Sequence, residues 1–125
     1  MAKRIRHPPS LMAKLGVKPG LSVAALGMPR PLVEALREAA GAVATRAGSG
    51  RDRVFLFAAG PAALAKIRAA KAALAPAGGL WLVRSKVDGR VTEADVLTAG
   101  RGAGLTDVKV ARIDEGLSAL KFVVL

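Results

Sequence analysis

The chain has 125 residues, of which 52% are apolar, and 20 Lys and Arg against nine Asp and Glu give it a net charge of +11. A chain of this length can bury one substantial core, and its positive charge favours anionic partners such as phosphates, nucleic acid or an acidic protein surface. It has no cysteine, which excludes disulfides, thiol nucleophiles and thiolate metal sites, and a reducing cytoplasm is the expected location.

The sequence predicts a flexible basic arm over residues 1–10 and a single domain over residues 11–125. The arm carries Lys3, Arg4 and Arg6, and no apolar stretch of signal-peptide length follows it. The most hydrophobic helical stretch is interrupted by three basic residues, so we expect no membrane span.

Six short apolar runs predict β-strands. The first of them has no polar alternation, which is typical of a strand covered on both faces in a parallel sheet. Only Asp114-Glu115-Gly116 separates the last two, and this connection is too short for a parallel crossover, so that pair must be antiparallel. The predicted strands are residues 21–27, 42–46, 53–58, 80–84, 108–113 and 119–125.

Helical periodicity fills most of the intervals between these strands. Gly41 is the expected C-terminal cap of one helix, and Thr92 with Asp95 three residues later predicts a capping box at the start of another. Strand and helix alternate three times before the final hairpin, and right-handed crossovers put helices on both faces of the sheet, as in a three-layer, doubly wound α/β domain. The predicted helices are residues 11–15, 29–41, 61–75 and 92–104.

The second half of the chain resembles the closing section of class I methyltransferases. More specifically, residues 14–20 (KLGVKPG), 78–83 and 104–123 are similar to an uncharacterised bacterial family of small methyltransferase-like proteins. The chain departs from this family at Leu117, where Trp is usual, and at residues 83–86, where Trp-Pro-Lys is usual. The resemblance implies a Rossmann-like sheet with strand order 2-1-3-4-6-5 and an antiparallel last strand. It implies no reaction, because that family has no established activity.

The predicted first strand is not followed by a methyl-donor motif. A class I methyltransferase binds its donor through a glycine-rich turn after the first strand and an acid at the end of the second, which hydrogen-bonds the ribose. Here Gly27 alone permits a close backbone approach, and the second strand ends at Thr45-Arg46 without a carboxylate. The sequence therefore argues against S-adenosylmethionine and predicts no other cofactor and no functional methyltransferase.

Basic residues follow several of the predicted strand ends, which is where open α/β sheets bind their ligands. Arg30 also stands at the start of a helix, where backbone N–H groups favour an anion. The sequence therefore predicts a small phosphate-bearing anion as the ligand, and chance clustering in an Arg-rich chain is the alternative. The candidate binding residues are Gly27, Met28, Arg30, Arg46, Arg84, Ser85 and Lys86.

Catalytic side chains are scarce. The chain has no Tyr, and its one histidine, His7, lies in the basic arm, so we assign no catalytic residue and favour a non-enzymatic domain. We interpret Asp114 and Glu115 as hairpin-turn residues, and residues 100–104 (GRGAG) as a helix end rather than a phosphate loop. No histidines or carboxylates have metal-ligand spacing.

Two other classes of function stay open. One is an RNA- or ribosome-associated accessory protein that uses Lys3, Arg4 and Arg6 without reading bases, since aromatic residues for base stacking are lacking. The other is an interaction module whose alanine-lined surfaces form a homo-oligomer or join a larger assembly.

Overall fold

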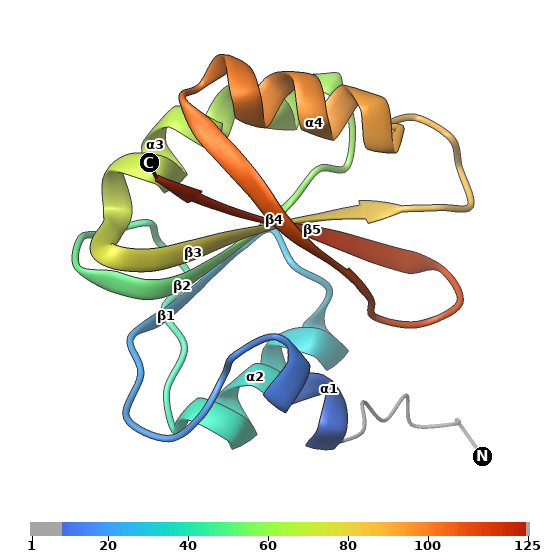
Figure 1. Cartoon of the computed structure of the whole chain (residues 1–125). Helices are drawn as coiled ribbons and strands as arrows, with labels where there is room; N and C mark the ends of the chain where they lie inside the picture. Colours follow the sequence, from blue (N-terminus) through green and yellow to red (C-terminus); the bar gives the residue numbers. More distant parts are fainter. Residues whose placement is uncertain (1–8, 125) are drawn as a thin grey trace.

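A computed structural model describes residues 9–124 as a mixed sheet between two layers of helices (Figure 1). Helices α1 and α2 cover one face, and α3 and α4 cover the other. The strands are β1 (Val23–Leu26), β2 (Arg51–Phe57), β3 (Leu74–Ser85), β4 (Leu105–Arg112) and β5 (Leu117–Val124). The helices are α1 (Pro9–Lys14), α2 (Arg30–Ala40), the 3₁₀ helix η1 (Pro61–Lys66), α3 (Ile67–Ala73) and α4 (Glu93–Gly102).

The sheet order is β1-β2-β3-β5-β4. Strands β1, β2 and β3 are parallel, and β5 is antiparallel to both of its neighbours, which confirms the predicted antiparallel hairpin. The sheet differs from the expected six-strand order in one strand, because residues 42–46, beside β1, contribute only one isolated bridge, between Ala24 and Ala44. The other five strands keep the expected order. The chain turns back after this bridge, and the Arg51 guanidinium holds the turn by donating to the carbonyl oxygens of Ala47 at 2.8 Å and Arg46 at 3.3 Å.

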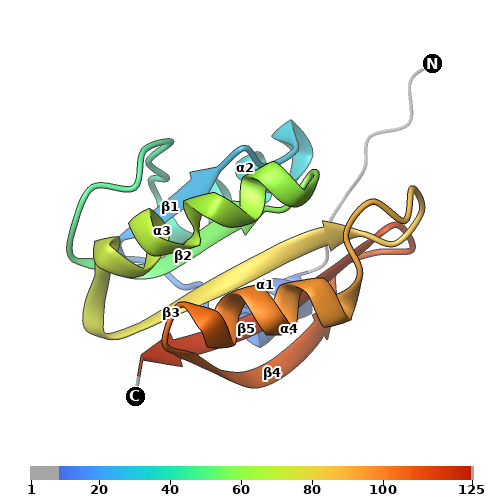
Figure 2. The same cartoon turned by 90° about the horizontal axis from the view of Figure 1, so that it is seen from above.

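Each face of the sheet buries its own apolar core. Toward α1 and α2, Phe55 and Trp81 stack with their ring centroids 6.5 Å apart, and both are fully buried. Toward α3 and α4, the core is aliphatic apart from Phe122. Figure 2 shows α3 on the β1–β2 side of this face and α4 beside it, toward β4. The alternation of side chains along the strands therefore produces two separate cores.

The predicted helix boundaries are confirmed where capping groups fix them. Gly41 ends α2 with a φ of 97° and donates its N–H to the carbonyl of Arg37. Thr92 and Asp95 form the capping box of α4, with each side chain accepting the other residue's backbone N–H. The helix predicted over 61–75 is wrong at both ends, since it begins as the 3₁₀ helix η1 and ends before Leu74, which pairs with Arg51 in the sheet.

Candidate functional site

At the carboxyl ends of β1 and β2, the chain leaves the two strands toward opposite faces of the sheet. The connection from β1 passes through α2 on one face, whereas the connection from β2 passes through α3 on the other (Figure 1). Gly27 follows β1 with a φ of 67° and is exposed, and a Cβ at this position would meet nothing within 4 Å. Met28 is buried and Arg30 is exposed at the start of α2. Open backbone and one cation therefore lie at this end of the sheet.

The predicted basic residues after β3 do not converge with Arg30. Arg84 lies toward α4, where it lines a hollow of about 10 Å³ with Glu93 and Val96, whereas Arg30 opens α2 on the opposite face. Lys86 is exposed. Ser85 accepts the N–H of Val87 with its hydroxyl oxygen at 3.2 Å, so this hydroxyl shapes the local turn.

Arg46 lies toward the other end of the sheet. Its carbonyl oxygen accepts from Arg51, the first residue of β2, and the same guanidinium donates to the hydroxyl of Ser22, just before β1. These contacts place the backbone of Arg46 near the amino ends of the strands, away from Arg84 and Lys86. The predicted anion-binding residues therefore lie in separate places and do not form one site.

Sequence reasoning missed Arg90, in the loop between β3 and α4. A Cβ placed on Gly60, just after β2, would lie 2.8 Å from Nη2 of Arg90, so this guanidinium lies directly over the Gly60 backbone. Gly60 itself is buried. A glycine directly after a strand was the available signal, but nothing in the sequence paired it with a residue 30 positions further along.

Two motifs prove to be structural. Asp114 accepts the N–H groups of Gly116 and Leu117 with one carboxylate oxygen, both at 2.8 Å, which is the expected role in a hairpin turn. Residues 100–102 lie in the last turn of α4, so the phosphate-loop pattern is a helix end. Between residues 9 and 124, no group of His, Asp or Glu side chains has an arrangement that would hold a metal ion.

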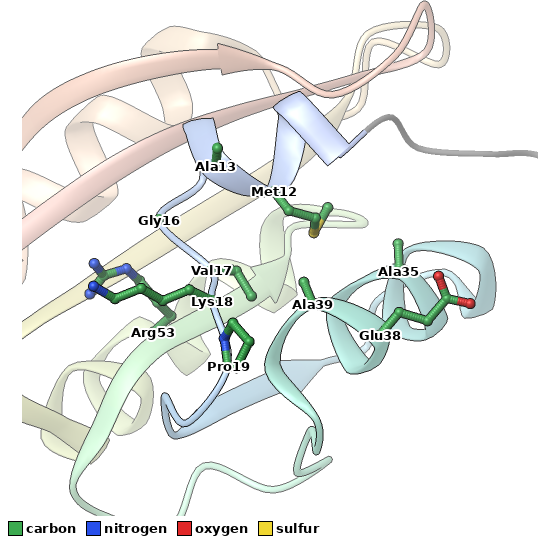
Figure 3. A pocket seen from close by; sticks show the side chains of 10 residues that line it. All are labelled: Met12, Ala13, Gly16, Val17, Lys18, Pro19, Ala35, Glu38, Ala39 and Arg53. Atoms are coloured by element: carbon green, nitrogen blue, oxygen red, sulfur yellow. The ribbon is translucent and has the colours of Figure 1, made fainter.

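A larger cavity lies beside helices α1 and α2. It is a groove of about 690 Å³ between α1, the segment 15–19 and α2 (Figure 3). Small apolar side chains line most of it. Lys18 and Arg53 extend on one side of the groove in Figure 3, and Glu38 lies on the other. The groove is therefore apolar along its length and charged at its ends.

A basic cluster adjoins this groove, consisting of Arg53, Lys109 and Lys121. The Lys121 ammonium lies 6.0 Å from the centroid of the Trp81 ring, and its pKa is lowered by burial first, then by the charges of Arg53 and Lys109. Lys109 donates to the carbonyl oxygen of Lys14 at 3.0 Å. Within the described chain, no carboxylate forms an ion pair with any member of the cluster.

Arg53 carries an unfilled hydrogen-bond donor. Its Nη1 donates to the carbonyl oxygen of Asp52, but its Nε is buried with no partner among residues 9–124. An unsatisfied buried donor on a charged group is costly.

None of the helices described is both long and apolar enough to cross a membrane.

No family model matches the sequence, and no curated protein is similar to it in sequence. Solved structures are similar in fold. The pyocyanin biosynthetic protein PhzM aligns with a TM-score of 0.69 and 11% identity over 91% of this chain and 53% of its own. Magnesium protoporphyrin IX methyltransferase from Synechocystis, with S-adenosylmethionine bound, aligns with a TM-score of 0.65 and 16% identity over 93% of this chain and 77% of its own.

A third similar structure is the precorrin-6y C5,15-methyltransferase of Geobacter metallireducens, with a TM-score of 0.66 and 12% identity over 93% of this chain and 86% of its own. The chain spans about half the length of PhzM, 53%, and of NcsB1, an O-methyltransferase from neocarzinostatin biosynthesis, 50%. At these identities the likeness concerns architecture. The chain has a methyltransferase-like α/β fold.

Proposed function

We propose that the chain is a methyltransferase-like domain that binds a small phosphate-bearing anion at the carboxyl ends of β1 and β2 and does not transfer methyl groups. The observation that carries this proposal is that a glycine follows each of β1 and β2, and that each glycine has an arginine near it in the sequence or in space. Arg30 follows Gly27, and Arg90 lies over Gly60. Neither guanidinium has a carboxylate partner in residues 9–124.

The chemistry of this end of the sheet suits phosphate. Ligands of open α/β sheets bind beyond the carboxyl ends of the strands where the strand order reverses, and glycines allow phosphate oxygens to approach the backbone. Arginine offers a planar set of donors that matches a phosphate group. Arg84, in β3, and Lys86, just after it, add positive charge at the same end of the sheet without sharing the site.

The same region lacks the group that would hold the methyl donor. Residues 39–50 contain no Asp or Glu, and the chain turns back after the Ala44 bridge instead of continuing as a strand. A ribose at this position would find no carboxylate to accept its hydroxyl hydrogens. Because the Synechocystis enzyme has S-adenosylmethionine bound, this donor is the direct competitor in any test of the proposal.

The test is calorimetric titration of the full chain with pyrophosphate, a nucleoside diphosphate, S-adenosylmethionine and S-adenosylhomocysteine. We expect the phosphate compounds to bind and the two donor compounds to give no heat. The Arg30→Gln/Arg90→Gln double variant should weaken pyrophosphate binding by roughly 10- to 100-fold, since each charge-assisted contact contributes about one factor of ten. Arg68→Gln, an exposed change on α3, is the matched control. Donor binding that the double variant abolishes would overturn the proposal.

The two other classes of function stay predictions. The residues proposed for RNA contact, Lys3, Arg4 and Arg6, lie outside the described residues. For self-association, Val108 and Val110 are exposed on the edge strand β4, 53% and 56% respectively, but Lys109 lies between them, and charged edge residues oppose strand pairing. Steep loss of RNA binding with salt would favour the first class.

A further inference from the structure

The groove between α1 and α2 has an apolar body and a cationic end. Met12, Val17 and Ala39 are among the apolar residues that line it, and Arg53 and Lys18 supply the positive charge. Its volume of about 690 Å³ falls within the range of small-molecule sites, roughly 300–1,000 Å³. An apolar ligand body would fit along the helices, with a charged head at the β2 side.

No carboxylate of residues 9–124 pairs with the positive charge at that side. Arg53 has a buried Nε without an acceptor, and Lys121 has no hydrogen-bond or ion-pair partner in the described part of the chain. Arg53 and Lys109 both stand close enough to Lys121 for their charges to lower its pKa. Residues 1–8 cannot supply the missing negative charge, because their ionisable side chains are all basic.

Two glycines make room for this cluster. A Cβ on Gly16 would lie 3.0 Å from both Nε and Nη2 of Arg53, and a Cβ on Gly79 would lie 2.6 Å from Cε of Lys121. A Cβ at position 79 would require the end of the Lys121 side chain to shift, since ordinary Cβ contacts begin near 3.4 Å. The chain therefore packs its two cationic side chains against bare backbone.

We propose that this groove binds an amphipathic anion, a molecule with an apolar chain or ring and one anionic head group. The head lies at Arg53 and Lys18, in the field of Lys109 and Lys121. The apolar body lies between α1 and α2. Glu38, at the other side of the groove, repels an anion and so fixes a single orientation for the ligand.

This site is distinct from the phosphate site proposed above. Arg53 lies near the start of β2, whereas Gly27 and Gly60 follow the carboxyl ends of β1 and β2. A ligand in the groove would contact neither Arg30 nor Arg90. The two proposals can therefore fail independently.

The test uses the full chain and three ten-carbon probes, which are decanoate, decyl phosphate and decanol, titrated below their aggregation concentrations. We expect both anions to bind at least tenfold more tightly than decanol, because only they have a charge to place against Arg53. The preferred anion then distinguishes a carboxylate head from a phosphate head. Equal binding of decanol, or no binding of either anion at about 1 mM, would overturn the proposal.

Variants separate the cationic end from the apolar body. Arg53→Met keeps most of the apolar stem and should weaken decanoate binding by at least tenfold, and Arg53→Lys should restore part of the loss. Ala39→Phe fills the groove from α2, where Ala39 is only partly buried, and should abolish binding of all three probes. If both variants fold and bind decanoate like the wild type, the groove is not the site.

Lys66→Met is the matched control, because Lys66 is an exposed cation at the end of η1 on the other face of the sheet. It should leave decanoate binding unchanged. The Arg30→Gln/Arg90→Gln double variant should also bind decanoate like the wild type. Loss of decanoate binding in that double variant would place the anion at the carboxyl ends of the strands and contradict the assignment to the groove.

Discussion

The two faces of the sheet are closed in different ways. The core under α3 and α4 consists of apolar side chains, and α4 approaches so closely that a Cβ on Gly100 would overlap the Phe122 ring. The face under α1 and α2 has an equally well buried centre around Trp81, but toward the amino ends of the strands it continues into Arg53 and Lys121. One core is closely packed, whereas the other ends beside a groove in cations that no carboxylate of residues 9–124 pairs with.

This difference helps to separate structural from functional positions. A close-packed apolar contact leaves no room for a ligand and is explained by stability alone. Partly buried cations without partners destabilise the free protein, so their presence beside a groove points to a ligand that supplies the missing charge. The comparison predicts that substitutions in the filled face change stability only, while those at the charged end also change binding.

The largest expected effect is from Trp81→Phe. The indole N–H donates to the carbonyl of Leu15 at 3.0 Å in a buried contact, so the variant loses this hydrogen bond and some packing volume, about 3 kcal/mol together. Urea unfolding measures the loss. Hydrogen exchange of residues 15–19 should also rise, because this bond ties the groove wall to the sheet.

Phe122→Leu is the matched control for that experiment. It truncates a fully buried ring in the other core and should destabilise the domain without a selective rise in exchange over residues 15–19. If both variants loosen that segment equally at matched stability, then the two faces are not independent and the comparison fails.

Gly100→Ala should be the next most damaging change. The new methyl group would overlap the buried Phe122 ring, and overpacking costs about 1–3 kcal/mol, which exceeds the helix-propensity gain of about 1 kcal/mol. The same substitution at Gly102, two residues along α4, meets nothing within 4 Å and should stabilise the domain slightly. Thermal unfolding of the two variants should therefore shift in opposite directions, and a stabilised Gly100→Ala variant would contradict the packing described.

Thr92→Ala should cost about 1 kcal/mol, the usual value for an N-cap. The Thr92 hydroxyl oxygen accepts the N–H of Asp95 at 3.1 Å, and the variant leaves that donor unpaired within the helix. Denaturant midpoints provide the measurement. Thr98→Ala, an exposed change within α4, should be neutral, and decanoate should bind both variants normally.

The smallest effect is expected from Lys121→Met and depends on pH. Burial and the charges of Arg53 and Lys109 lower the pKa of Lys121 from 10.5. Between the lowered value and 10.5 the unfolded chain binds more protons than the folded one, so the stability of the wild type rises with pH across this interval. The variant should therefore melt above the wild type at pH 7, and this advantage should shrink toward pH 10.5. A variant that melts below the wild type at pH 7 would show that Lys121 stabilises the free protein.

Much of the fold was predictable because local chemistry fixes it. The capping box of Thr92 and Asp95, the Gly41 cap and the short Asp114 hairpin each depend on residues within a few positions. The prediction of a strand over 42–46 was wrong because the Arg51 side chain holds a turn there, and this turn ends the backbone pairing with β1. Such a contact between side chain and backbone leaves no periodic signal.

The candidate sites were less predictable for the same reason. Sequence reasoning placed Arg30, Arg46 and Arg84 together by their positions after predicted strands, but the alternation of β3 sends Arg84 to one face while α2 carries Arg30 on the other. Arg53 was included in a strand without any indication of the groove beside it. Which cations converge depends on the register of distant strands, such as the pairing of Trp81 with Lys121, and register cannot be read from composition.

Amide chemical-shift mapping of the full chain tests the central claim most directly, with pyrophosphate, decanoate and S-adenosylmethionine titrated separately. The account predicts that pyrophosphate shifts the amides of Gly27 and Gly60, that decanoate shifts those of Gly16 and Val17, and that S-adenosylmethionine shifts neither set. A shift of the Gly27 amide by S-adenosylmethionine at lower concentration than by pyrophosphate would contradict it.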